Sequence, residues 1–212
     1  MTTDNRAAAL SFAVLTPSRG LVHSRTIEAV QANVARALAA GHTFAGWVLT
    51  HDLPIPDCHE RVTELGLATG ADALWFVEED MIPPTGALVD SIAQLAAGGI
   101  AAMDYPQGCD HPYVNSVPHT DTPDWCGTGC ALIARRVFEA LERPWFVVDD
   151  QWTPYYGGQE TQFFRRAGAA GFRTARVPGV AGHALLRSWG RFMAQDGRHD
   201  IEIRDTIEMV RG

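Results

Sequence analysis

Short apolar runs alternate along the chain with segments whose apolar residues recur every three or four positions. The runs end in polar or Pro-containing stretches, which is typical of buried strands. Predicted strands cover residues 11–16, 46–50, 73–77 and 100–103. Three helices are predicted between the strands. The first carries Ile27, Val30, Val34 and Leu38 on one face, and the second spans about residues 57–69. The third places Leu88, Ile92 and Leu95 on one stripe. This alternation favours βαβ units, and continuously apolar strands favour a sheet that is covered on both faces.

The pattern changes after residue 104. Residues 105–125 are rich in Pro, Asp, His and Tyr and have little periodicity, which predicts a long loop. The elements expected next are a strand at 127–134, a short helix at 136–141, a helix at 160–168 with Phe163, Phe164 and Ala167 on its buried side, a strand at 172–177, and a tail or helix at 184–212. The whole pattern predicts one α/β domain over residues 1–212, with a Rossmann-like three-layer fold and a mainly parallel central sheet.

Composition narrows the class of protein. The 212 residues are 46% hydrophobic and 20% charged, with a formal net charge of −8, which is typical of a globular protein and unfavourable for nonspecific binding to nucleic acid. All 17 basic residues are Arg, which excludes a Schiff-base lysine and a P-loop lysine. No apolar stretch approaches the ~20 residues of a membrane span, and no charged leader precedes an apolar run, so we expect a cytoplasmic protein with reduced cysteines.

Three carboxylates, Glu78, Glu79 and Asp80, directly follow the third predicted strand. Ligands of such sheets sit at the carboxyl ends of strands, and hard divalent cations prefer carboxylate oxygens. In an extended segment residues i and i+2 point the same way, so we expect Glu78 and Asp80 to share a face and Glu79 to point away. The alternative is a solvated acidic loop, but the position of the cluster favours a cation site.

The segment from Ala71 to Pro84 resembles the strand and Asp-x-Asp motif of metal-dependent glycosyltransferases with the A-type nucleotide-sugar-binding fold. The resemblance, which is to family 2-like members, implies that Mn²⁺ or Mg²⁺ bridges the diphosphate of a nucleotide-sugar donor, with UDP-sugar as the expected donor. Glu78 and Asp80 match the two acids, and Glu79 lies among the donor contacts. Because this chain has Glu in the first place, Asp80 is the stronger candidate for a direct ligand.

Three later segments resemble further motifs of that family. The run from Trp125 to Arg136 resembles the Gly-rich segment beside the donor sugar, which assigns Gly127, Thr128 and Gly129 to the donor and Trp125 to the acceptor. The run from Tyr155 to Phe164 resembles the Glu-Asp motif at a helix start, which assigns Glu160 as the catalytic base and Tyr155 and Tyr156 to the acceptor; Gln159 and Glu160 replace the two acids. The run from Val177 to His183 resembles the segment that carries the metal-binding histidine, which assigns His183 to the metal, and Arg187 follows as a phosphate contact.

The resemblance also implies contacts of the nucleotide with residues nearer the N-terminus, namely Thr16, Pro17, Arg19, Asp52 and Arg61. It divides the chain into a nucleotide-binding half at 11–104, an acceptor and catalytic half at 105–190, and a C-terminal tail at 191–212. The reaction it implies is glycosyl transfer to an acceptor hydroxyl, and the carboxylate at position 160 favours inversion.

Three other functions stay open on the sequence. Cys109, His111, His119, Cys126 and Cys130 could form a zinc-binding module, although their spacing is irregular. A sugar nucleotidyltransferase would share the fold, but the short loop after the first strand and the absence of Lys count against it. A non-catalytic sugar or nucleotide binder would fit the substitutions at Gln159 and Glu160.

The acceptor is a further question, and one hypothesis is modified DNA, as in phage-type enzymes that glycosylate hydroxymethylated pyrimidines. The hypothesis rests on the small size of the chain and on its Arg-richer C-terminal part, and the acidic net charge weighs against it. A phage-encoded enzyme of this kind would act in the host cytoplasm.

Overall fold

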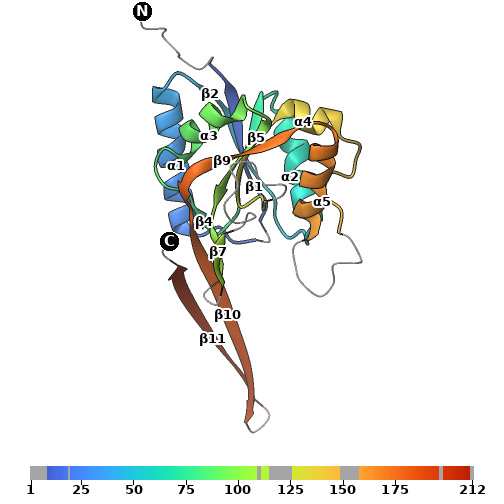
Figure 1. The fold of residues 1–212 in the computed structure, drawn as a ribbon. Coiled ribbons are helices and arrows are strands. Elements are labelled where there is room, and N and C mark those ends of the chain that lie inside the picture. Colours follow the sequence, from blue (N-terminus) through green and yellow to red (C-terminus); the bar gives the residue numbers. More distant parts are fainter. Residues whose placement is uncertain are drawn as a thin grey trace, which may run out of the picture.

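A computed structural model describes residues 9–18, 20–108, 111–114, 126–148, 158–195 and 198–210. The chain forms a mixed α/β fold around a six-stranded sheet with helices on both faces (Figure 1). The sheet strands are β1 (Ser11–Thr16), β2 (Thr43–Leu49), β3 (Ala73–Val77), β5 (Gly99–Asp104), β8 (Cys130–Ala134) and β9 (Arg173–Val180). The helices are α1 (Ser24–Ala39), α2 (Asp57–Ala68), α3 (Ala87–Leu95), α4 (Arg135–Ala140) and α5 (Gly158–Ala169). The predicted fold class is confirmed.

The strands of the central sheet follow the order β2-β1-β3-β8-β5-β9. All are parallel to one another except β8, which runs antiparallel to both of its neighbours. The chain enters β8 after residues 105–129, which contain no helix in their described part, and an antiparallel neighbour needs no helical crossover. Consequently the start of β8, with the Gly-rich segment before it, lies at the same sheet edge as the carboxyl ends of β3 and β5.

Helices α1 and α3 cover one face of the sheet, and α2, α4 and α5 cover the other (Figure 1). On the second face an aromatic cluster of Phe76, Phe138, Phe146 and Phe163 joins β3 to α4 and α5, with ring centroids 5.1–6.1 Å apart. The predicted burial of Phe163, Phe164 and Ala167 on α5 is confirmed. This packing holds the first turn of α5 against the carboxyl end of β3.

The buried face of α1 differs from the predicted one. Thr26, Val30, Asn33 and Ala37 are buried, whereas Ile27 and Leu38 are exposed. The reason lies in Asn33, whose side-chain oxygen accepts hydrogen bonds from the backbone N–H groups that open α3 and whose amide donates to two backbone carbonyls. A buried amide with four partners replaces the apolar contact that a hydrophobic pattern can detect.

Three further expectations need correction. The strand predicted as buried at 46–50 is β2, a half-buried strand at the edge of the sheet. The loop expected at 105–125 contains a small hairpin of β6 (Pro106–Gly108) and β7 (His111–Val114).

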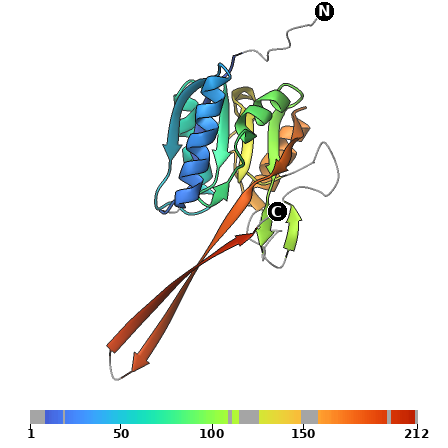
Figure 2. The ribbon, with the colours of Figure 1, turned by 90° about the vertical axis from the view of Figure 1, so that its left-hand side faces the viewer.

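The tail or helix expected at 184–212 is instead a long antiparallel hairpin of β10 (Gly182–Gln195) and β11 (Arg198–Val210). It projects from the body of the molecule (Figures 1 and 2), and at its base β10 pairs with the short strand β4 (Met81–Ile82). Within the described residues, no helix is both long and apolar enough to cross a membrane.

Candidate functional site

The predicted acidic motif lies at the carboxyl end of β3, where the extended backbone ends. The N–H of Glu78 donates to the carbonyl of Gly129 (3.1 Å), and the carbonyl of Glu78 then accepts from the N–H of Met81 (3.1 Å), which closes a turn. The alternation of i and i+2 therefore stops at Val77. Glu78 and Asp80, which were expected to share a face, each contact a different histidine.

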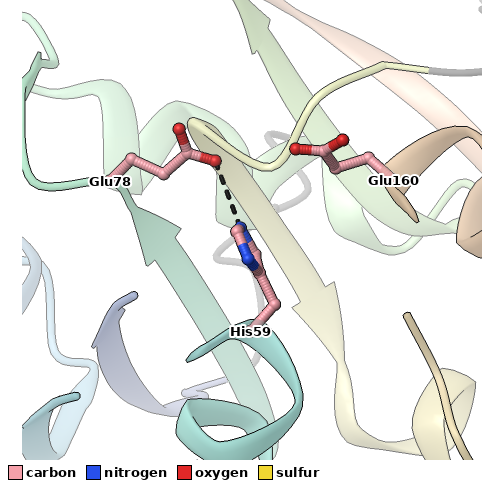
Figure 3. Close-up of side chains that lie close together, drawn as sticks. All are labelled: His59, Glu78 and Glu160. Carbon is pink, nitrogen blue, oxygen red and sulfur yellow. Dashed lines mark hydrogen bonds and ion pairs between the residues drawn. The ribbon is translucent and has the colours of Figure 1, made fainter. Parts of the chain in front are cut away.

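Glu78 belongs to a cluster with the buried His59 and with Glu160, and both carboxylates of the cluster are partly exposed. Oε1 of Glu78 lies 3.4 Å from Nε2 of His59, a residue of α2, and accepts a hydrogen bond from Oγ1 of Thr128 (3.0 Å). Glu160 comes from the first turn of α5, and its carboxylate faces that of Glu78 (Figure 3). One ligand atom of each of the three residues lies within 4.8 Å of the other two, the one such group found among the described residues.

Burial and charge shift the pKa values of this cluster in different directions. Burial would lower the pKa of His59, but hydrogen bonds to Cys58 and Glu78 and the charges of Glu78 and Glu160 raise it to about 10. Burial would raise the pKa of Glu78, but the hydrogen bond and charge of His59 keep it below its usual range. Burial and the charge of Glu78 raise the pKa of Glu160 to about 7. At neutral pH an ion pair of His59 and Glu78 therefore stands beside a carboxyl group that is close to its own midpoint.

Asp80 and His183 form a second pair at the base of the projecting hairpin. Oδ2 of Asp80 lies 3.2 Å from Nε2 of His183. The backbone fixes both residues, because His183 is in register with Met81 and the N–H of Ala184 donates to the carbonyl of Asp80 (2.8 Å). Two residues that lie 103 positions apart in the sequence, and that were predicted together as metal ligands, are thus adjacent.

The Gly-rich segment before β8 lies beside this acidic edge. Gly127, Thr128 and Gly129 are all buried, and Thr128 holds Glu78 as described. A Cβ on Gly129 would meet the ring of Tyr105 at 2.7 Å, so only glycine fits there without a shift. The ring of Tyr105 also packs edge-on against the ring of His183, with centroids 5.8 Å apart, and so links the two histidine–carboxylate pairs.

The other predicted donor contacts fall into two groups. Thr16 and Pro17 are buried at the end of β1, and Oγ1 of Thr16 accepts a hydrogen bond from the indole of Trp47 (2.9 Å). Asp52, in the loop after β2, has a φ of 54° and places its carboxylate beside Gly20 in the loop after β1. These two loops are therefore neighbours at the same edge of the sheet.

Two predicted contacts have partners outside the cluster. Arg61 sits on the outer face of α2, is half-exposed and pairs with Glu64 (2.8 Å), so the structure does not bring it to the site. Glu79 is 8% exposed, and its carbonyl accepts from the N–H of His23 at the start of α1.

Several predicted residues cannot be placed. Arg19, Trp125, Tyr155 and Tyr156 lie outside the described residues, as do Cys109 and His119 of the alternative zinc module. Arg187 is placed only by its backbone, in β10 opposite Thr206. Cys126 and Cys130 are buried free thiols.

Sequence reasoning missed His59 and Tyr105. His59 lies in a predicted helix, 19 residues before Glu78, in a Cys-His-Glu run without ligand spacing. Tyr105 is the first residue of the loop predicted at 105–125, and no role in the site was predicted for it. The packing of α2 brings His59 to the acidic edge, and Tyr105 reaches it at the end of β5, which is separated from β3 by β8.

Comparisons with known proteins give the fold but no family. No family model matches the chain, and no curated protein does. Among solved structures, A197 from STIV is 16% identical with a TM-score of 0.62, covering 96% of this chain and 98% of that one. Glucosyl-3-phosphoglycerate synthase from Mycobacterium tuberculosis, solved with Mn²⁺, uridine diphosphate and phosphoglyceric acid, is 14% identical with a TM-score of 0.45, covering 96% and 90%. A nucleoside-diphosphate-sugar pyrophosphorylase from Vibrio cholerae RC9 is 11% identical with the same score, covering 80% and 92%.

The likeness to A197 shows a shared fold across nearly the whole of both chains. At 16% identity it says nothing of activity, and the two likenesses with a TM-score of 0.45 carry no argument.

Proposed function

We propose that the chain is a metal-dependent glycosyltransferase that moves a sugar from a nucleotide-sugar to an acceptor hydroxyl with inversion. The observation that carries the proposal is the contact between Asp80 and His183, which a strand end and a distant hairpin bring to 3.2 Å. A carboxylate and an imidazole at this spacing are an acceptable ligand pair for Mn²⁺, and the N-terminal turn of α5 presents Glu160 at the same edge of the sheet.

In this proposal Asp80 and His183 hold the cation, and Glu78, tied to His59 and Thr128, stays outside its first shell. When bound, Mn²⁺ or Mg²⁺ would neutralise the negative charge that develops on the diphosphate as it leaves. The loops after β1 and β2, with Thr16, Pro17 and Asp52, would face the nucleotide. Gly127 and Gly129 would let the backbone approach the sugar closely.

Glu160 would act on the acceptor. The acceptor oxygen forms a bond to the anomeric carbon, the bond from that carbon to the diphosphate oxygen breaks, and the hydroxyl proton passes to the carboxylate of Glu160. A carboxyl with a pKa of about 7 is well matched to this work near neutral pH, because an ideal general base has a pKa close to the operating pH.

Donor binding is the first test. A screen of nucleotide-sugars by thermal shift, with and without Mn²⁺, should show stabilisation by one donor class only when the metal is present, because a ligand of the native state raises the melting temperature. Asp80→Ala should lose this metal-dependent stabilisation and hydrolysis of the donor. A fully active Asp80→Ala variant would show that the motif has been misassigned.

The role of Glu160 is tested separately. Glu160→Gln should keep the Mn²⁺-dependent shift with the donor but lose transfer, by about 100-fold or more for removal of a general base. Arg61→Gln, on the outer face of α2, is a control that should retain both. If the chain instead released pyrophosphate from a sugar 1-phosphate and a nucleoside triphosphate, the nucleotidyltransferase reading would replace this one.

The acceptor proposal of hydroxymethylated pyrimidine in DNA has its own test. Its support is the concentration of arginines after residue 134 in an otherwise acidic chain. Duplex DNA should bind at ~150 mM salt, where weak phosphate contacts are screened, and transfer should require the hydroxymethyl group. Equal transfer to unrelated small hydroxyl acceptors, without any binding of duplex, would reject DNA as the acceptor.

A further inference from the structure

The cluster of His59, Glu78 and Glu160 offers ligands that the proposed cation pair does not use. We propose that these three residues form a second divalent-cation site that suits zinc. When zinc fills this site, Glu160 can no longer act as the proposed base. Binding of zinc here is independent of the proposed glycosyl transfer, whereas the loss of the base depends on that function.

The ligand set is one imidazole and two carboxylates, from α2, the end of β3 and the first turn of α5. Figure 3 shows the three side chains converging on one point from three directions. Zinc takes such mixed nitrogen and oxygen ligands at catalytic sites, where three protein ligands leave one position open.

The spacing favours a tetrahedral cation. With metal–ligand distances of about 2.0–2.2 Å, two ligands of a tetrahedral ion lie about 3.3–3.6 Å apart. Nε2 of His59 and Oε1 of Glu78 are 3.4 Å apart, which is long for a charge-assisted hydrogen bond but matches the separation of two ligands of a tetrahedral ion. Because no two of the three ligand atoms are more than 4.8 Å apart, closure around an ion needs side-chain movements on the order of 1 Å.

The carboxylate of Glu160 provides a second, independent observation. It faces the carboxylate of Glu78, and within the described part of the chain no side chain donates a hydrogen bond to it. Two facing carboxylates repel each other, and the charge of the protonated His59 ring offsets only part of that repulsion. A divalent cation that displaces the proton of His59 would offset more of it and would also bind the carboxylate of Glu160.

The surroundings hold the other two ligands in place. Nδ1 of His59 lies 3.3 Å from Sγ of Cys58, and the ring packs against that of Phe146 with centroids 5.4 Å apart. Oγ1 of Thr128 fixes Glu78. Outer contacts of this kind orient ligands before a metal binds and raise its affinity.

Zinc bound at this site would prevent Glu160 from acting as the proposed base. Zinc bound to the carboxylate of Glu160 would withdraw negative charge from both of its oxygens and lower their affinity for the proton of the acceptor hydroxyl. Micromolar zinc should therefore inhibit an enzyme that Mn²⁺ supports at the Asp80–His183 pair, and dilution into a chelator should restore the rate.

Binding is measured directly on the full chain, stripped with chelator and titrated with ZnCl₂ by calorimetry and equilibrium dialysis. His59→Gln and Glu160→Gln should each weaken one zinc site by more than about 100-fold, since even outer-shell changes cost 10–100-fold. His183→Gln, which removes a histidine from the other pair, should retain that site. Unchanged zinc affinity in both His59→Gln and Glu160→Gln would overturn the proposal.

Two controls test the folding of the variants and the identity of the zinc ligands. Circular dichroism and thermal melting establish that each variant is folded, and Glu160→Gln decides the matter if His59→Gln does not fold. Replacement of zinc by Co²⁺ should give visible bands of a four-coordinate ion without a thiolate charge-transfer band. A thiolate band that disappears in Cys58→Ser or Cys126→Ser would move the site to the cysteines and refute the ligand set. Zinc binding without any glycosyl transfer would reject the proposed function and leave the site standing.

Discussion

Replacing Glu160 with glutamine should stabilise the metal-free protein above neutral pH, although the same change is expected to abolish transfer. The carboxyl faces Glu78 at the carboxyl end of β3, and burial together with that charge raises its pKa from 4.5 to about 7. Ionising Glu160 in the native state therefore costs free energy that glutamine, which is neutral at every pH, does not cost. If Glu160 is the proposed base, its placement lowers the stability of the fold that carries it.

The size and direction of the effect follow from linkage. A pKa of about 7 in the folded chain, against 4.5 when unfolded, corresponds to roughly 3 kcal/mol when the group is fully ionised, as an upper figure. Because the native state binds the proton more tightly, this cost is absent below pH 4.5, grows as the pH rises and is complete above about pH 7. Relaxation of the partly exposed side chain reduces it, so we expect Glu160→Gln to gain about 1–3 kcal/mol over the natural chain above pH 7.

Urea unfolding at several pH values between 5 and 8.5, in the presence of EDTA, measures this difference. The difference between Glu160→Gln and the natural chain should grow towards pH 7 and then level off. Glu139→Gln, an exposed residue of α4 that pairs with Arg135, is the matched control and should run parallel to the natural chain. Parallel curves for Glu160→Gln, or a natural chain that becomes the more stable one as pH rises, would refute the reasoning.

Two further predictions concern the frame of the site. Gly129→Ala should destabilise the fold by about 1–3 kcal/mol in urea, because its Cβ would overlap the ring of Tyr105, whereas Gly168→Ala, in open space on α5, should be neutral or stabilising. Glu60→Ala should cost about 1–3 kcal/mol by thermal and urea unfolding, because its carboxylate accepts from two backbone N–H groups in the segment that follows α4. An effect of Glu60→Ala no larger than that of Glu139→Ala would mean that those N–H groups find water instead.

The parts of the fold that could be predicted are those where local pattern and burial agree. β3 is a continuous apolar run because it lies in the middle of the sheet, and α3 buries the stripe of Leu88, Ile92 and Leu95 that its period indicates. On α1 the pattern misled, because Asn33 is buried by hydrogen bonds rather than by apolar contact. A period counts hydrophobic residues, so it cannot detect a polar side chain that is satisfied inside the protein.

The C-terminal hairpin and the place of His59 in the site were not predicted, for two different reasons. The segment 184–212 looked polar because β10 and β11 project from the body and are not covered as the sheet strands are (Figure 2). Asp80 and His183 could be paired through the resemblance, since their motifs occur in the expected order. His59 could not, because its place beside Glu78 depends on how α2 packs, which no spacing along the chain encodes.

The two histidine–carboxylate pairs differ in how the fold holds them, and this difference bears on their roles. Paired backbone positions His183 and Asp80: β10 pairs with β4, which begins directly after Asp80, and the N–H of Ala184 donates to the Asp80 carbonyl. The two Cα positions cannot separate unless these backbone hydrogen bonds break. His59, Glu78 and Glu160 instead lie on three separately packed elements that no backbone pairing joins at the site, and Glu160 meets the other two only through its side chain. A cation that must present a diphosphate in one geometry needs the first kind of support, whereas a site that fills and empties with the metal supply needs the second.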